Sequence, residues 1–97
     1  MIKDPLRTTE EVVDGYIHIA KMIEKGGNLA QAEQVYKSAL SLAVSQNGEQ
    51  SAATGYALVE LWDLYERQGR QKEAQKMWER LRRLLDRYYA EMTEENN

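Results

Sequence analysis

The same arrangement of glycine, alanine and aromatic residues occurs twice in the chain, 42 residues apart. Residues 26–40 read GGNLAQAEQVYKSAL, and residues 68–82 read QGRQKEAQKMWERLR. The positions that fall in register are Ile19 with Leu61, Ile23 with Tyr65, Gly27 with Gly69, Ala32 with Ala74, Tyr36 with Trp78 and Ala39 with Leu81. Self-similarity at a fixed period indicates a structural unit that cannot bury its apolar face alone and stacks on a neighbour.

Apolar residues recur three and four positions apart, which is the period of an α-helix, and no stretch alternates as a strand would. The predicted helices run from about 9 to 25, from a cap at Asn28 to about 46, from about 50 to 68 and from about 71 to 92. Residues 1–8 are expected to be a lead-in and residues 93–97 a disordered tail. Short turns make sequential helices antiparallel neighbours, so the predicted fold class is all-α, with two stacked helix hairpins in one domain.

Two segments carry a resemblance to a known family. LWDLYERQGRQKEAQKMWERL (61–81) and IAKMIEKGGNLAQAEQVYKSA (19–39) share the spacing of large apolar residues, glycine, alanine and an aromatic residue. This spacing resembles the tetratricopeptide repeat, whose usual period is about 34 residues. The longer period here resembles the long-helix variety of kinesin light chains and many bacterial proteins. Trp62 departs from the pattern, because the family prefers a small residue there, as at Ala20.

The resemblance implies an α-α superhelix of two repeats, about 9–47 and 49–90, that acts as a non-catalytic adaptor. The family binds proteins or peptides, usually in a groove lined by the first helix of each hairpin. Carried over by position, the groove residues are Asp14, Ile17, His18, Lys21, Glu24, Lys25, Tyr56, Val59, Glu60, Asp63, Glu66 and Arg67. A plain four-helix bundle with a structural role is the alternative fold.

The last predicted helix has more apolar surface than its own hairpin can cover. Arrays of this kind need about three units and a polar capping helix, and the spacing shows two units and no dedicated cap. The candidate interface residues are Trp78, Leu81, Leu84, Leu85, Tyr88, Tyr89 and Met92. Exposed apolar patches mark interfaces, so we expect a homodimer or a stable protein partner. The alternatives are a monomer in which the third helix covers the patch, and a longer parent chain whose next repeat covers it.

Charge is distributed unevenly along the chain. Residues 67–87 have a net charge of +5, residues 1–66 a net charge of −5, and the whole chain −3. One stripe of the last helix holds Lys72, Lys76, Arg80, Arg83 and Arg87. Such a stripe can bind the phosphates of a nucleic acid, an acidic protein surface, or only water and neighbouring carboxylates. Binding of nucleic acid is the least favoured of the three.

The sequence offers little for catalysis. His18 is the one histidine and cysteine is absent, so triads, thiolate zinc sites and disulfides have no residues to build on. We therefore expect no enzyme activity, no cofactor and no metal. The polar start MIKDPLRTTEE has no apolar run typical of a signal peptide, and no segment has the apolar length of a membrane span. The predicted location is the cytoplasm.

Overall fold

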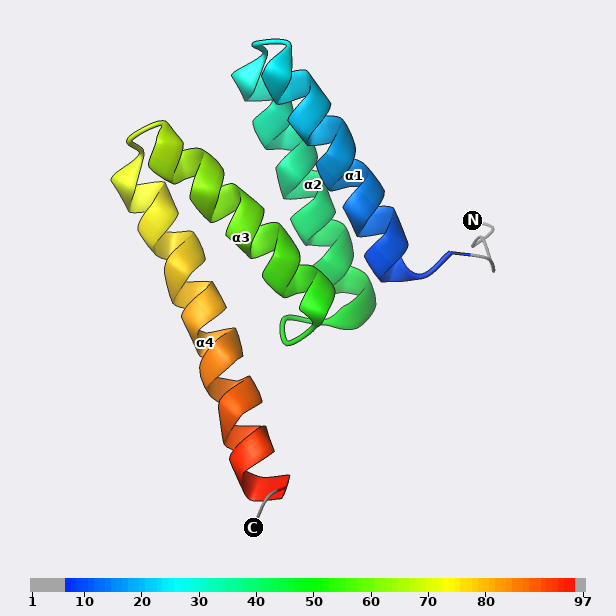
Figure 1. Ribbon diagram of the computed structural model, residues 1–97, viewed down its shortest axis with the longest axis vertical. Coiled ribbons are helices and arrows are strands. Elements are labelled where there is room, and N and C mark those ends of the chain that lie inside the picture. The colour runs from blue at the N-terminus through cyan, green and yellow to red at the C-terminus, as the bar shows by residue number, and fades with distance from the viewer. Residues whose placement is uncertain (1–6, 96–97) are drawn as a thin grey trace.

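The computed structural model describes residues 7–95, and this part of the chain consists of four α-helices without a strand (Figure 1). The helices are α1 (Thr9–Lys25), α2 (Leu29–Asn47), α3 (Ala52–Arg67) and α4 (Gln71–Glu95). Helices α1 and α2 form one antiparallel hairpin, and α3 and α4 form a second. Helix α3 packs against α2 and, over a smaller area, against α1. The predicted all-α class with two stacked hairpins is confirmed.

Side-chain caps determine where the first three helices begin. In each case a side-chain oxygen accepts from a backbone N–H group three residues later, at 3.1 Å. The oxygen of Thr8 accepts from Glu11, that of Asn28 from Gln31 and that of Ser51 from Thr54. An oxygen in this position satisfies one of the amides that a helix start leaves without a partner. The sequence predicts the third helix from about residue 50, but the extended backbone of Ser51 moves its start to Ala52.

Helix α4 continues past the predicted end at Met92 to Glu95. The expectation of a disordered tail is therefore wrong for residues 93–95. No glycine or proline follows Met92 before residue 96, so nothing in the sequence ends the helix there. Residues 96–97, and residues 1–6 of the predicted lead-in, lie outside the described residues.

The two hairpin turns have the same geometry. Gly27 and Gly69 have φ values of 92° and 70°, which only glycine adopts without strain. Backbone bonds close each turn: the N–H of Asn28 donates to the carbonyl of Ile23 at 3.4 Å, and the N–H of Arg70 donates to that of Tyr65 at 2.9 Å. This is the Schellman pattern of a helix C-terminus. The repeat seen in the sequence is therefore repeated in the backbone.

Gly27→Ala and Gly15→Ala are expected to change the free energy of unfolding in opposite directions. A Cβ at either position would meet nothing within 4 Å, so packing does not distinguish them. Alanine at Gly27 is forced into the left-handed region and costs about 1 kcal/mol, whereas alanine at Gly15 in α1 gains up to about 1 kcal/mol of helix propensity. Urea unfolding midpoints measure both. A loss of stability in Gly15→Ala would contradict the helical assignment of α1 around that residue.

The core lies where the two hairpins meet. Its large fully buried members are Val13, Ile17, Tyr36, Leu58, Leu61 and Leu64. Small residues such as Ala32, Ala39 and Ala57 are also buried and let the helices approach closely. The result is a slab 18 Å thick, with α4 at one edge and the C-terminal part of α4 projecting past the α2–α3 loop (Figure 1). None of the described helices has the length and apolarity to cross a membrane.

Candidate interaction surfaces

The face between α1 and α3 holds a set of paired charges. Lys21 Nζ lies 3.3 Å from Glu60 Oε1. Arg67 pairs with Glu24 of α1, and its Nε also donates to Asp63 Oδ2 at 3.0 Å. These residues and Lys25 line a shallow depression of about 410 Å³. The structure thus brings together six of the residues predicted for the groove, and it joins most of them to each other by ion pairs.

The other predicted groove residues lie elsewhere. Ile17 is buried, with 1% of its surface exposed, so its assignment to a partner-binding face is wrong. The reason is that position 17 points into the α1–α2–α3 core. Val59 lines a different groove, between α3 and α4. Tyr56 lines that groove too, but it also interacts with Asp14 and Lys21 of α1. Asp14 and His18 are exposed on α1 without lining the depression.

A buried carboxylate that the repeat pattern does not predict joins α2 to the α3–α4 turn. Glu33 Oε1 accepts from Arg70 Nη1 at 2.6 Å, and its Oε2 accepts from the Tyr65 hydroxyl at 2.9 Å. Lys37 Nζ lies 3.1 Å from the same Oε2 atom. The bonds from Arg70, Lys37 and Tyr65 outweigh burial and lower the pKa of Glu33 from 4.5 to about 2. Burial, together with the bond to Glu33, raises the pKa of Tyr65 to about 12.

The sequence does contain a signal for this site. Glu33 lies three residues before Tyr36 and seven before Leu40, so it belongs to the apolar stripe of α2. A charge on a buried stripe requires a partner. Glu24 of α1 is a second carboxylate with partners on other helices. It accepts from the Tyr36 hydroxyl at 2.9 Å and from Arg67. The bonds from Arg67 and Tyr36 lower the pKa of Glu24. Both carboxylates connect elements of the core, and their role is structural.

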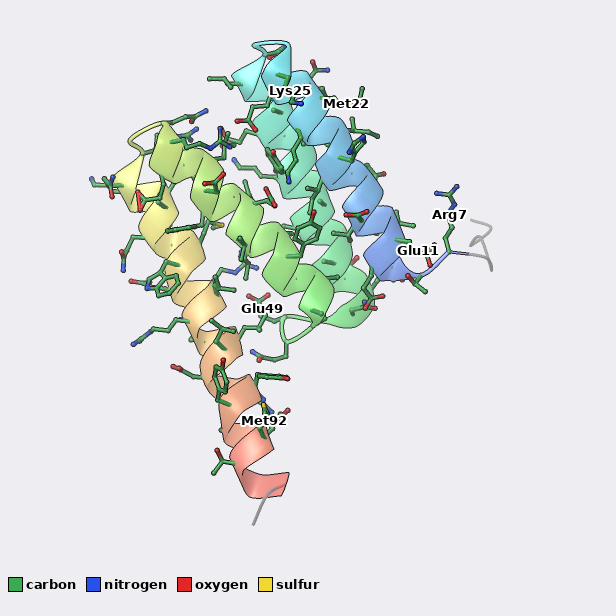
Figure 2. All side chains as sticks on the ribbon, viewed as in Figure 1. Arg7, Glu11, Met22, Lys25, Glu49 and Met92 are labelled. Atoms are coloured by element: carbon green, nitrogen blue, oxygen red, sulfur yellow. The ribbon has the colours of Figure 1, made fainter. Side chains whose placement is uncertain are left out.

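An apolar groove of about 520 Å³ lies between the start of α3 and the second half of α4. Tyr56 and Val59 line it from α3, and Leu84, Leu85 and Tyr88 line it from α4. Beyond the groove none of the described helices lies opposite α4, because α3 begins at Ala52 while α4 continues to Glu95. Figure 2 shows Met92 on this projecting part. Tyr89 and Met92 are exposed, and so are Leu85 and Tyr88 at the groove.

Two residues of the predicted α4 interface lie in other surroundings. Leu81 is buried against α3 with 8% exposure, so it is a core residue at the floor of the groove and cannot itself contact a partner. Trp78 lies nearer the α3–α4 turn, with its ring centroid 6.3 Å from that of Trp62. The large residue at position 62, which the repeat pattern disfavours, is thus half-buried against Trp78 at the surface of the second hairpin.

The basic stripe of α4 is partly neutralised within the chain. Arg80 donates from Nε and Nη2 to both oxygens of Glu49, at 2.8 and 3.1 Å. Glu49 belongs to the α2–α3 loop and reaches toward α4 (Figure 2). The bond from Arg80 lowers the pKa of Glu49, and Arg87 pairs with Glu91 at 3.4 Å. Lys72, Lys76 and Arg83 complete the stripe on exposed positions.

Comparison with family models, with curated proteins and with solved structures finds no match to the chain. The resemblance to the tetratricopeptide repeat therefore stays a prediction, which depends on residue spacing. Within the described residues, no group of three or more histidine, aspartate or glutamate side chains is placed to hold a metal ion.

Proposed function

We propose that the chain is a non-catalytic protein–protein interaction module, built from two tetratricopeptide-like hairpins, that docks through the groove between α3 and α4. The observation that carries this proposal is the uncovered apolar surface of α4. Leu85, Tyr88, Tyr89 and Met92 are 36–61% exposed and adjoin a groove whose lining is mostly apolar. Contiguous apolar surface of this kind favours a partner over water, because its burial removes it from the solvent.

The α1–α3 face supports a partner less well. Its cations and carboxylates already satisfy each other, with Lys21 on Glu60 and Arg67 on Glu24 and Asp63. A partner would have to replace these pairs or desolvate them, and desolvation of an ion pair offsets much of what it gains. The groove between α3 and α4 carries a smaller cost, since most of its lining is apolar and its polar side chains, such as Gln50 and Glu91, belong to no ion pair that a partner at its apolar centre would have to break.

Leu85→Glu is expected to weaken binding at this groove by at least about tenfold. Helical peptides selected from a random library on the immobilised protein should bind wild type in the micromolar range. They should lose at least about tenfold in affinity for Leu85→Glu, because a charge would face apolar side chains in the centre of the groove. Fluorescence anisotropy of labelled peptides measures the affinities.

Lys72→Glu is the matched control, since Lys72 is exposed on α4 away from the groove and its replacement should leave the affinities unchanged. Binders that respond to Lys72→Glu and ignore Leu85→Glu would transfer the function to the basic stripe. A selection that yields no binders would overturn the proposal.

A further inference from the structure

The chain contains one boundary between repeat units, and this boundary shows what covers such a surface. The first hairpin is covered by α3, whose Leu58, Leu61 and Leu64 are at most 1% exposed. The residues in register on α1 are Tyr16, Ile19 and Met22. They are just as apolar, but 41%, 50% and 60% exposed, and Figure 2 shows Met22 on the edge of α1 away from α3. Helix α1 thus presents on the outside the kind of face that α3 uses inside.

The receiving surface is repeated in the same way. Ile17, Tyr36 and Ala43 of the first hairpin are buried at the boundary with at most 1% exposure. Their counterparts in the second hairpin are Val59, Trp78 and Leu85. These are 36–41% exposed, because no described helix follows α4 to cover them. The outer face of α1 at one end of the slab therefore matches the α3–α4 face at the other end in the way that α3 matches the first hairpin.

Charges at the boundary follow the same register. Inside the chain, Arg67 of α3 pairs with Glu24. The counterparts are Lys25, at the C-terminal end of α1 where it also lines the α1–α3 depression, and Glu66 on α3, again a cation and a carboxylate. In a single copy Lys25 and Glu66 are both exposed.

A second pair is also preserved in kind. Lys21 of α1 pairs with Glu60 of α3, and the counterparts are Asp63 and His18. Asp63 takes the place of Lys21, and His18 takes the place of Glu60. The carboxylate of the pair therefore lies on the other side of the boundary from that of the pair inside the chain. Both register-related pairs therefore remain able to form a hydrogen bond or ion pair.

We propose that copies of this chain associate head to tail, with the outer face of α1 of one copy seated on the α3–α4 face of the next. The arrangement repeats the boundary between the two hairpins, and it rests on the proposed function because it uses the same groove. The partner is thus a second copy of this chain. Such an interface is heterologous, so it leaves one free face at each end and allows further copies to add.

The coverage of α1 favours this arrangement over a symmetric pairing of two α4 helices. Helix α4 carries six basic and six acidic residues, so its net charge of zero does not decide between the two arrangements. A symmetric α4 pair would leave Tyr16, Ile19 and Met22 uncovered.

Two single variants test the proposal by light scattering on a sizing column over a concentration series. Ile19→Glu blocks the α1 face and Leu85→Glu blocks the α3–α4 face, and both residues are exposed, so each variant keeps its fold, checked by circular dichroism. Wild type should exceed the monomer mass of 11.2 kDa increasingly with concentration. Each variant alone should remain at the monomer mass. Their equimolar mixture should give a species of twice that mass that grows no further, since one intact interface forms.

The mixture also separates the competing models. A symmetric α4 dimer predicts that Ile19→Glu still dimerises and that mixing restores nothing, and that result would overturn the head-to-tail proposal. Wild type that stays monomeric at millimolar concentration would overturn it as well. Neither result affects the peptide test at Leu85, so the proposed function stands or falls separately.

A charge exchange tests the register itself. In the mixture, the interface joins Lys25 of the Leu85→Glu copy to Glu66 of the Ile19→Glu copy. Adding Lys25→Glu to the first copy alone should weaken the dimer about fivefold, the range of an exposed ion pair. Adding Glu66→Lys to the second copy as well should restore the affinity. A double exchange that weakens the dimer further would show that these side chains do not meet.

Discussion

Replacement of Leu61 by alanine is expected to lower the free energy of unfolding by about 3 kcal/mol. Leu61 is 1% exposed in the centre of the boundary between the hairpins. Truncation of a buried leucine costs the lost transfer free energy and the cavity left behind, together about 2–5 kcal/mol. A domain of this size has only about 5–10 kcal/mol in total. Leu61→Ala should therefore lose roughly a third or more of the stability, with a matching drop in the urea midpoint.

Ile19→Ala is the matched control, because Ile19 occupies the same position of the repeat in α1. It is 50% exposed, so its truncation should change the free energy of unfolding by less than about 0.5 kcal/mol. Both variants are to be measured at low micromolar concentration, so that the proposed association of copies contributes as little as possible to the measured stability. Equal losses in the two variants would mean that α1 is covered by another part of the protein.

Glu33→Gln is expected to destabilise the fold at pH 7 by about 2 kcal/mol and to flatten its response to acid. The charged carboxylate joins Arg70, Lys37 and Tyr65. Its pKa is about 2 in the folded chain, against 4.5 ordinarily. A lowered pKa means that the stabilisation is fully present above pH 4.5 and is lost as the pH falls toward 2. A glutamine side chain at this position keeps the shape of the glutamate but loses the charge that Arg70 requires.

Urea unfolding at pH 7, 5, 4 and 3 measures this effect. Wild type should lose more stability than Glu33→Gln between pH 5 and 3, and the two curves should approach each other at the acidic end. The variant keeps a smaller acid response, because the pKa values of Glu24 and Glu49 are lowered too. Glu73→Gln is the control, since it removes an exposed partner of the same Arg70. Parallel curves for wild type and Glu33→Gln would contradict the role given to Glu33.

Local sequence signals predict the four helices and their turns. Caps such as Thr8 and Asn28 act on amides within three residues, and Gly27 and Gly69 act on their own backbone. Such effects require no knowledge of distant neighbours. The same reasoning places the end of α4 three residues too early, because polar composition alone does not end a helix that no glycine or proline interrupts.

Candidate site residues are predicted less well, because their exposure depends on elements far away in the sequence. Ile17 and Leu81 lie on the expected faces of their helices but are buried by α3. The sequence assigns Tyr56 and Val59 to the α1–α3 groove, yet the position of α4 places Val59 in the α3–α4 groove and lets Tyr56 line that groove while it interacts with Asp14 of α1. Helical periodicity gives the direction of a side chain on its own helix, whereas it contains no information on which helix lies opposite.

The sequence by itself determined the helices, the two glycine turns and the repeat register, because these follow from interactions between residues a few positions apart. Only the tertiary structure decided which equivalent residues are covered. Ile19 and Leu61 occupy the same repeat position, and one is half exposed while the other is buried. The physical reason is that burial depends on a neighbouring unit. Helix α3 has this neighbour in the first hairpin, whereas no described element covers the outer side of α1 within a single copy.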